Sequence, residues 1–260
     1  MPYLAKILLY PVKSLDGVEV ENATVLASGA LKSDREFAIF DDSQNFVNGK
    51  RHAKIHLLRA QFTLFNRTIS LQIPGDDAQQ IFHLDEERKA LEAALSDFFE
   101  FAVKLQQNSL TGFPDDLNSP GPTVISTATL TEVASWFPDV SVNEMRRRIR
   151  ANIEIGDVPP FWEDQLFSAE SETVSFRVGD VHFFGVQPCK RCVVPTRNPD
   201  SGLAYQSFQK TFVQQRQATL PSWVAASRFR HFYSLSVNTR LPISAVGKTL
   251  QIGNEVQIIS

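Results

Sequence analysis

The chain has 260 residues, of which 43% are hydrophobic and 21% charged, and its net charge is −3; this composition is typical of a globular protein with one large domain or two modest ones. Neither a basic excess nor an apolar run of ~18 residues is present, so neither a nucleic acid nor a membrane is expected as a partner. The N-terminal apolar stretch is too short for a signal sequence, and two cysteines exclude a disulfide scaffold, so we expect a cytoplasmic protein.

The first part of the chain is predicted to form β-strands and one helix. Short runs rich in β-branched and aromatic residues alternate there with turns rich in Gly, Asn, Asp and Pro. The predicted strands cover residues 4–10, 18–26, 36–40, 57–65 and 68–73. A helix is predicted from a cap at Asp85 to Phe99, because its apolar residues recur at helical spacing.

The middle of the chain begins with a polar segment rich in turn-forming residues at 107–122, which we interpret as a linker or a long surface loop. Residues 123–126 follow as a predicted strand. Thr129 and Glu132 have the spacing of a capping box, which predicts a short helix that ends at Pro138. Apolar and polar residues alternate over 148–155, and this period of two predicts another strand.

The last part of the chain is again rich in predicted strands. Residues 174–186 are expected to form a strand pair that turns at 179–180, and further strands are predicted at 232–237 and 249–259, with a turn at 253–254. The sequence therefore predicts a mostly β fold of the α+β class, with three or four helices in two β-rich halves.

The densest chemical motif is Cys-Lys-Arg-Cys at 189–192. Structural zinc needs four ligands, and no second cysteine pair or suitably spaced histidine follows. A thioredoxin-like dithiol precedes a helix within a βαβ unit, whereas this motif precedes a turn rich in Pro, Asn, Asp and Gly. Two further interpretations remain: a pair of small core residues, or a single thiolate ligand to a redox metal, favoured by the adjacent Lys190 and Arg191.

Several other residues are suited to anion binding. Lys13 and Ser14 end the first predicted strand and offer a cation and a hydroxyl group to a phosphate, while Arg35 offers a bidentate fork. Each is equally explained as a surface charge or, for Arg35, as half of a buried ion pair. Residues 126–128 lie near a helix start, where backbone N–H groups favour an anion, although simple capping explains the same pattern.

Two sets of motifs resemble a known family. Cys-x-Arg-Cys at 189–192, followed by Thr-x-x-Pro-x-x-Gly at 196–202, resembles the MOSC domain, the C-terminal domain of molybdenum-cofactor sulfurase. Tyr-Pro-Val-Lys-Ser at 10–14 and Asp-Arg-Glu-Phe at 34–37 resemble the N-terminal β-barrel domain that accompanies it. Together they resemble the mitochondrial amidoxime-reducing component and its bacterial relatives. The resemblance implies two β-barrel-like domains, at 1–106 and 123–260, joined by 107–122.

The resemblance also implies a cofactor, a molybdenum atom held by the dithiolene of a phosphate-bearing pterin. Cys192, the second cysteine of the pair, would complete its sulfur ligands and act as the catalytic cysteine. By position in the family, or by proximity to the expected pocket, the cofactor-binding residues would be Lys13, Ser14, Arg35, Ser126, Thr127, Ala128, Arg150, Asn152, Lys190, Arg191, Cys192 and Asn238. Lys190 departs from the small polar residue usual at its position.

The implied activity is the reductive removal of oxygen from nitrogen in hydroxylamines and amidoximes, an oxidoreductase reaction that serves detoxification. Two adjacent cysteines cannot form a Cys₄ iron–sulfur site, so electrons are expected from a separate ferredoxin, flavoprotein or cytochrome b5-like donor. The run Arg146, Arg147 and Arg148 is interpreted as solvated surface or as a docking patch for that donor.

An alternative function belongs to a different class. The protein would then be a molybdenum cofactor carrier or a sulfur-transfer module with a persulfide at Cys192. The N-terminal half has no obvious pyridoxal-phosphate lysine motif, so the chain is not expected to be a desulfurase by itself. A third interpretation is a non-catalytic β-domain with an incidental Cys-x-Arg-Cys.

Overall fold

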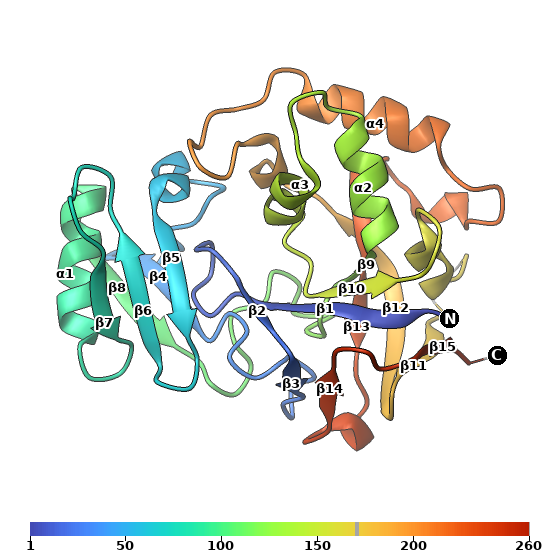
Figure 1. The fold of residues 1–260 in the computed structure, drawn as a ribbon, viewed down its shortest axis with the longest axis horizontal. Helices are drawn as coiled ribbons and strands as arrows, with labels where there is room; N and C mark the ends of the chain where they lie inside the picture. Colours follow the sequence, from blue (N-terminus) through green and yellow to red (C-terminus); the bar gives the residue numbers. More distant parts are fainter. Residues whose placement is uncertain (170–171, 260) are drawn as a thin grey trace.

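A computed structural model describes residues 1–169 and 172–259. It confirms the α+β class, with strands in four sheets and, within the described residues, four α-helices (Figure 1). The largest sheet has eight strands in the spatial order β15 (Val256–Ile258), β11 (Val174–Val178), β12 (Val181–Lys190), β13 (Ser234–Arg240), β9 (Val124–Ser126), β10 (Ile153–Gly156), β1 (Tyr3–Leu9) and β2 (Val18–Val20). Its apolar side chains form the main core.

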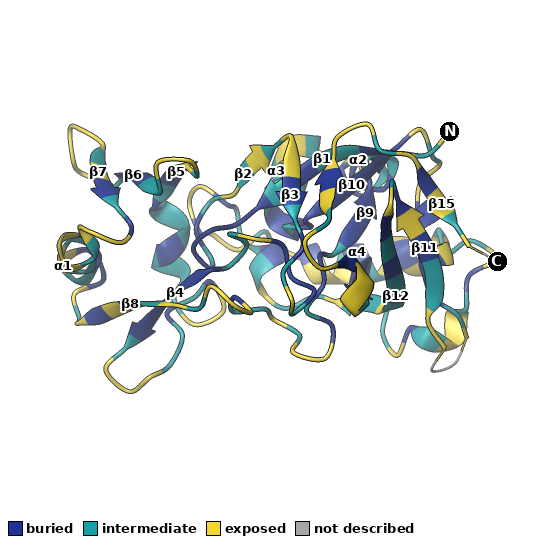
Figure 2. Cartoon of the chain, turned by 90° about the horizontal axis from the view of Figure 1, so that it is seen from below, coloured by how far each residue is buried: buried dark blue, intermediate teal, exposed yellow. Residues whose placement is uncertain are grey.

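The smaller sheets lie mostly in the first part of the chain. Their strands are β4 (Phe37–Asp41) with β8 (Val103–Gln107), β5 (Arg59–Thr63) with β6 (Thr68–Gln72) and β7 (Gln80–His83), and β3 (Asn22–Thr24) with β14 (Thr249–Gln251). Helix α1 (Arg88–Phe99) packs its buried face on a second core that it forms with β4, β5, β6, β7 and β8. Many strand residues are buried, and exposed residues lie in connecting loops and on α1 and α4 (Figure 2).

A third core lies beside the large sheet. It is formed by α2 (Thr127–Ser135), α3 (Val142–Ile149) and α4 (Phe208–Ala218) with residues from β9 and β13. The short 3₁₀ helices of the chain are Ala53–Leu57, Trp162–Leu166, Val194–Thr196, Ala226–Arg228 and Ile243–Ala245. No helix in the described part of the chain has the length and apolar character needed to cross a membrane.

The start of the chain is built into sheets with later segments. β1 pairs antiparallel with β10, so that Ile7 lies opposite Ile153, and β3 pairs with β14 near the C-terminus. The expected β-barrel closure is not found, because no sheet formed by the described residues closes on itself. The domain boundaries 1–106, 107–122 and 123–260 stay a prediction.

The strand predicted at 148–155 is wrong for its first half. Residues up to Ile149 belong to α3, Arg150 is its left-handed cap with φ 56°, and only Ile153–Gly156 forms a strand. The helix starts at Val142 and is capped by Ser141, whose hydroxyl group accepts a hydrogen bond from the Glu144 N–H. All four residues of β10 are buried, so the alternation does not mark a half-exposed strand.

The cap predicted at Thr129 is also wrong. Ser126 caps α2, because its hydroxyl oxygen accepts the Thr129 N–H at 3.0 Å, and the helix therefore begins at Thr127. Helix α1 begins at Arg88 rather than near Asp85. The strand pair at 174–186 is confirmed as β11 and β12. The strands in 249–259 are confirmed as well, but β14 pairs with β3 and β15 with β11, not with each other.

A buried polar cluster joins α2 to the 3₁₀ helix Trp162–Leu166. Glu163 is 1% exposed, and its Oε2 accepts a hydrogen bond of 3.0 Å from the Thr129 hydroxyl group. The neighbouring Asp164 pairs with the fully buried Arg216 of α4. Burial and the Asp164 carboxyl group raise the pKa of Glu163 to about 7.

Replacing Glu163 with Gln is expected to change how stability depends on pH. The raised pKa means that the folded chain disfavours the carboxylate above pH 7, and this cost disappears as the pH falls toward the ordinary value of 4.5. The wild type should therefore gain about 2 kcal/mol over the variant between roughly pH 8 and pH 5.5. Urea denaturation of both proteins at each pH tests this. If the free energies of unfolding of the two proteins changed in parallel with pH, the prediction would be contradicted.

Candidate functional site

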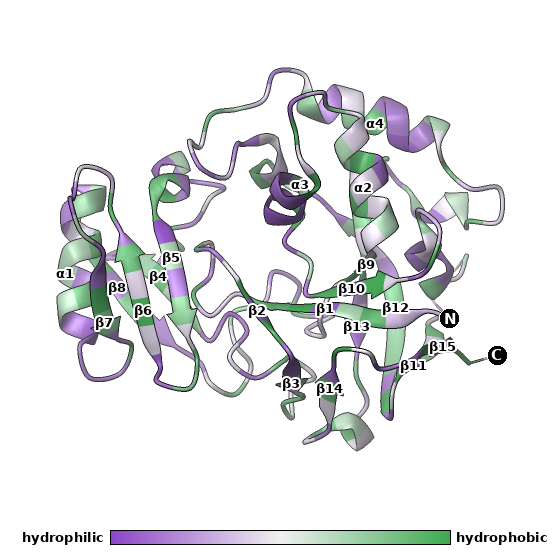
Figure 3. Ribbon diagram, in the orientation of Figure 1, coloured by the Kyte–Doolittle hydropathy of each residue, from purple (hydrophilic) through white to green (hydrophobic). Residues whose placement is uncertain are grey.

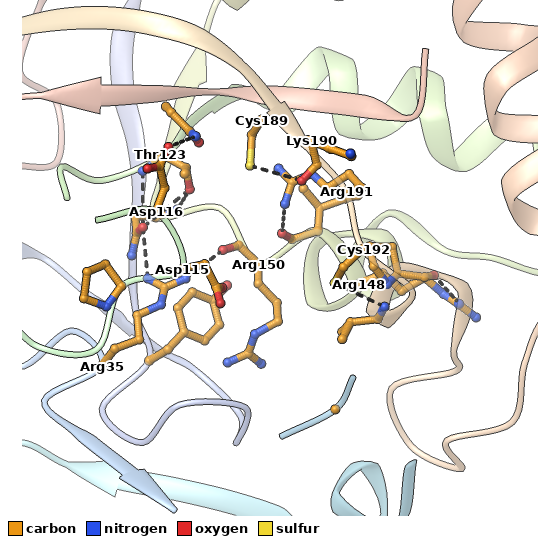
Figure 4. Close-up of a pocket in the computed structure, with 18 of the residues that line it drawn as sticks. Arg35, Asp115, Asp116, Thr123, Arg148, Arg150, Cys189, Lys190, Arg191 and Cys192 are labelled. Carbon is orange, nitrogen blue, oxygen red and sulfur yellow. Dashed lines mark hydrogen bonds between the residues drawn. The ribbon is translucent and has the colours of Figure 1, made fainter. Parts of the chain in front are cut away.

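A cavity of about 1050 Å³ lies where the first sixty residues meet the later part of the chain (Figure 4). Its walls come from the segment after β1, the loop before β9, the end of α3 and the end of β12. This volume exceeds that of most pockets for drug-sized ligands, which hold ~300–1,000 Å³. The cavity is therefore large enough for an extended ligand.

The cavity is strongly basic. Among the described residues, its lining contains ten arginines and three lysines against four aspartates. These cations are half of the 26 lysines and arginines of a chain whose net charge is −3. Such a concentration of one charge focuses a positive potential in the cavity and favours an anionic ligand.

Two guanidinium groups lie against the ring of Tyr10. The Arg35 and Arg150 groups are 4.7 and 4.1 Å from the ring centre. Arg35 is held in place, since it pairs with Asp34 and donates a hydrogen bond of 3.0 Å to Asn152 Oδ1. Burial opposes the charge of Arg35, but the Asp34 carboxylate outweighs it and raises the pKa of Arg35.

Arg150 differs from Arg35 in having no counter-ion. Within the described residues, its half-buried guanidinium group makes no hydrogen bond and no ion pair. Burial lowers the pKa of Arg150, and the nearby Arg35 adds to that shift. A half-buried cation without a partner is costly in the free chain and is stabilised when an anion binds.

The thiols of both cysteines line the cavity. Cys189 lies in β12, Cys192 follows that strand, and both are half-buried free thiols. The backbone N–H of Val194 points at the Cys192 sulfur at 3.4 Å. The interpretation of the pair as core residues is therefore wrong. The described residues contain no group of three or more His, Cys, Asp or Glu placed to hold a metal ion.

The neighbours of Cys192 have different surroundings. Lys190 is exposed at the cavity rim and, in the described part of the chain, its ammonium group has no bonded partner. Arg191 donates to the carbonyl oxygens of Ile149 at 2.9 Å and Leu235 at 2.6 Å. The Arg191 guanidinium group therefore joins α3, β12 and β13 and fixes the segment that carries Cys192.

Lys13 and Ser14 both line the cavity. Lys13 is 10% exposed in its side chain and donates to the Phe113 carbonyl oxygen at 2.8 Å and to Asp115 at 2.9 Å. Burial lowers the pKa of Lys13, and the Asp115 pair opposes that shift. Ser14 has φ 74° and accepts a long hydrogen bond from Gly49.

The two predicted asparagines also line the cavity. The strand face predicted to carry Arg150 and Asn152 is wrong, since both of those residues precede β10. Asn152 is 2% exposed and donates to the Leu8 carbonyl oxygen while accepting from Arg35, so it positions that arginine. Asn238 of β13 donates to Asp116 at 3.1 Å.

Ser126, Thr127 and Ala128 are the predicted site residues that the cavity does not include. Ser126 is fully buried as the cap of α2, and Thr127 donates a weak hydrogen bond of 3.4 Å to Glu154. The nine other predicted residues meet at one cavity, which is the arrangement that the family resemblance implies. Their contact with a cofactor stays a prediction.

The predicted solvated patch of three arginines is wrong. Figure 3 shows α3 as strongly hydrophilic, yet Arg146 forms a salt bridge with the fully buried Glu154. Arg148 is 1% exposed, pairs with Glu144 at 2.6 Å and donates to the Pro195 and Arg197 carbonyl oxygens. Of the three, Arg147 is the most exposed, and it too pairs, with Asp16 and Asp200.

Sequence reasoning missed several residues of the cavity. His56 lines it with an Nε2 atom that is buried and has no hydrogen-bond partner in the described structure. Burial and nearby guanidinium groups lower the pKa of His56 to about 4, so the ring is neutral at pH 7. Asp115 and Asp116 also face the cavity. Their position in a turn-rich segment predicted only a loop.

Fold and site together define an α+β protein with a basic, thiol-bearing cavity. A family model described as the MOSC N-terminal beta barrel domain matches residues 1–140. The chain belongs to this family.

Two curated proteins are similar to the chain. Molybdenum cofactor sulfurase from Caenorhabditis elegans is 24% identical over 223 residues, which are 77% of this chain and 30% of that protein. Molybdenum cofactor sulfurase 1 from Aedes aegypti is 34% identical over 74 residues, which are 28% of this chain and 10% of that protein. The chain thus spans less than a third of the length of these relatives, and the names of both relatives refer to the molybdenum cofactor.

Proposed function

We propose that the cavity binds the molybdenum cofactor and that the protein is an oxidoreductase that reduces N-hydroxylated compounds. One observation carries the proposal: the Cys192 thiol lines the same cavity as the uncompensated Arg150. A thiol suits a soft metal ligand, and a half-buried guanidinium group suits a phosphate. Both features fit a phosphate-bearing pterin that holds molybdenum.

When bound, the cofactor supplies the two-electron redox chemistry. The chain supplies binding and orientation. Arg150 and Arg35 balance anionic charge, and Asn152 keeps the Arg35 fork in place. The Val194 N–H points at the Cys192 sulfur and would stabilise negative charge on it, and Lys190 lines the same cavity. Electrons would come from a separate ferredoxin, flavoprotein or cytochrome b5-like donor.

Elemental analysis and an activity screen test this proposal together. Purified protein is expected to contain about one molybdenum per chain, to release a pterin fluorophore on oxidation, and to reduce hydroxylamines or amidoximes with an artificial reductant. A second candidate is a cofactor carrier or sulfur-transfer module, and the names of the two relatives favour neither candidate over the other. Cyanide-labile sulfur without molybdenum would support that candidate, and finding neither would reject both.

Replacing Arg150 with Met is expected to separate stability from binding. The variant should bind inorganic pyrophosphate at least roughly tenfold more weakly, a loss of about 1.4 kcal/mol, because the uncompensated cation is gone. Its free energy of unfolding should be unchanged or higher, because a half-buried charge without a partner has been removed. Calorimetric titration and urea denaturation measure the two effects.

The matched control is Arg177→Met, which removes an exposed arginine of β11 outside the cavity. It should alter neither quantity by much. If Arg150→Met bound pyrophosphate as the wild type does, Arg150 would have no role in anion binding.

A further inference from the structure

The loop at 112–121, here called the strap, runs along the cavity between two anchor points. At one end the Phe113 N–H donates to the Arg35 carbonyl oxygen at 2.8 Å. At the other end the Gly121 N–H donates to the Thr239 carbonyl oxygen at 3.1 Å. A Cβ atom at Gly121 would approach that oxygen to 2.7 Å, so the close contact depends on glycine. The strap thus connects a first wall of the cavity, the segment that carries Lys13 and Arg35, with an opposite wall formed by β12 and β13.

Asp115 of the strap holds the cations of the first wall. Its carboxylate lies 2.9 Å from the Lys13 ammonium nitrogen and 3.6 Å from that of Lys50. Desolvation would raise the pKa of Asp115, but the two lysines outweigh it and hold that pKa below its usual range. The carboxylate is therefore charged at neutral pH and takes the place that an anionic ligand would have beside Lys13.

Asp116 holds donors of the opposite wall. Its Oδ2 atom accepts hydrogen bonds from Asn238 at 3.1 Å and from Gln187 at 3.4 Å. These side chains belong to β13 and β12, next to the segment that carries Cys192. Figure 4 shows both carboxylates among the residues that line the cavity. Two consecutive carboxylates thus bind donor groups on both walls: Asp115 pairs with lysines, and Asp116 accepts hydrogen bonds from amide side chains.

We propose that Asp115 and Asp116 are built-in competitors of the anionic ligand, and that ligand binding releases the strap from Lys13 and Asn238. The proposal deepens the proposed function and rests on it only in treating the cavity as an anion site. It makes the two aspartates determinants of affinity, because each has to give up its partner before the ligand gains that partner.

The exchange favours the ligand for two reasons. The Asp115 side chain is already 66% exposed while that of Lys13 is 10% exposed, so the carboxylate can move into water at little cost, and the ligand gives the buried ammonium group a new counter-ion. Arg150 adds attraction for the ligand, because within the described residues it forms no salt bridge with a carboxylate. The competition therefore lowers the affinity of the cavity for anions without abolishing it.

Calorimetric titration of the full ligand-free chain with inorganic pyrophosphate tests the proposal. Asp115→Asn is expected to bind about tenfold more tightly than the wild type, a gain of ~1.4 kcal/mol. Asp139→Asn, which removes an exposed carboxylate outside the cavity, should bind as the wild type does. Binding that is unchanged or weaker in Asp115→Asn would overturn the proposal.

Limited digestion of the wild type provides a second test that does not depend on the folding of a variant. Leu117, at the middle of the strap, is 83% exposed and is a site for chymotrypsin. Pyrophosphate should accelerate cleavage after Leu117, whereas protection by pyrophosphate would contradict release of the strap. Pyrophosphate contains no metal, so the strap proposal can hold even if the protein carries no molybdenum. Failure of the strap proposal is therefore distinguishable from failure of the proposed molybdenum-dependent function.

Discussion

Protein carrying Cys192→Ala is expected to contain only background molybdenum and to lose reductase activity toward N-hydroxylated compounds. Losing even a residue that supports a metal ligand lowers affinity or activity typically 10–100-fold, so removing a ligand should lower activity by at least about 100-fold. Elemental analysis and a reductase assay with an artificial donor measure the two losses. The fold should survive, because the Cys192 side chain is half-buried at the cavity and outside the cores.

Cys189→Ala provides the matched control. The two cysteines lie three positions apart, line the same cavity and are both half-buried. Cys189→Ala should retain molybdenum and most activity. If Cys192→Ala kept both properties, the assignment of the metal ligand would be wrong, and if only Cys189→Ala lost them, the first cysteine would be the ligand. A loss of cyanide-labile sulfur alone would favour the carrier function.

Arg148→Met is expected to reduce the free energy of unfolding by about 3 kcal/mol. Arg148 is 1% exposed and donates to Glu144 and to two carbonyl oxygens of the segment after Cys192, at 2.7–2.8 Å. Methionine fills a similar volume but leaves the two carbonyl oxygens without their side-chain donor and removes the buried cation beside Glu144. Urea denaturation of the ligand-free chain measures the loss.

Arg147→Met, one position earlier in α3, is the control for Arg148→Met. The Arg147 side chain is 37% exposed, and its ion pairs with Asp16 and Asp200 are accessible to water. Its replacement should cost less than about 1 kcal/mol. Equal losses in the two variants would show that the buried contacts of Arg148 are worth no more than surface ion pairs.

The strands of the fold were largely predictable because their signals are local. Turn residues and runs of β-branched and aromatic residues located β1, β4, β6 and the pair β11 and β12 to within a few residues. The pairing of β1 with β10 joins residues about 150 positions apart. No pattern within either strand contains that information, since pairing depends on how the whole core assembles.

The error at α3 has a specific physical cause. Its arginines resemble the solvated face of an alternating strand, but Arg146 and Arg148 are neutralised by Glu154 and Glu144 inside the protein. Ile149 and the residues of β10 are buried whatever their position in the alternation. Apolar periodicity does not predict the correct secondary structure where polar residues are buried as ion pairs, because burial of that kind depends on partners elsewhere in the chain.

The candidate site was predictable where a motif contained it. Lys13, Ser14 and Arg35 follow motifs of the family, and the structure brings them to the cavity that Cys192 lines. His56 and the two aspartates of the strap carry no local signal, because their place in the cavity depends on tertiary contacts. They determine the charge balance of the site as much as the predicted residues do.

The position of β1 also affects how the chain is made. Its main partner, β10, begins at Ile153, so the first strand leaves the ribosome long before its neighbour exists. At ~5–20 residues per second, the edge of β1 that faces β10 stays unpaired for on the order of ten seconds, while β2 can already pair with the other edge. Completion of the basic cavity is consequently a late event in biosynthesis, and any prosthetic group that it receives must be inserted after translation has passed that point.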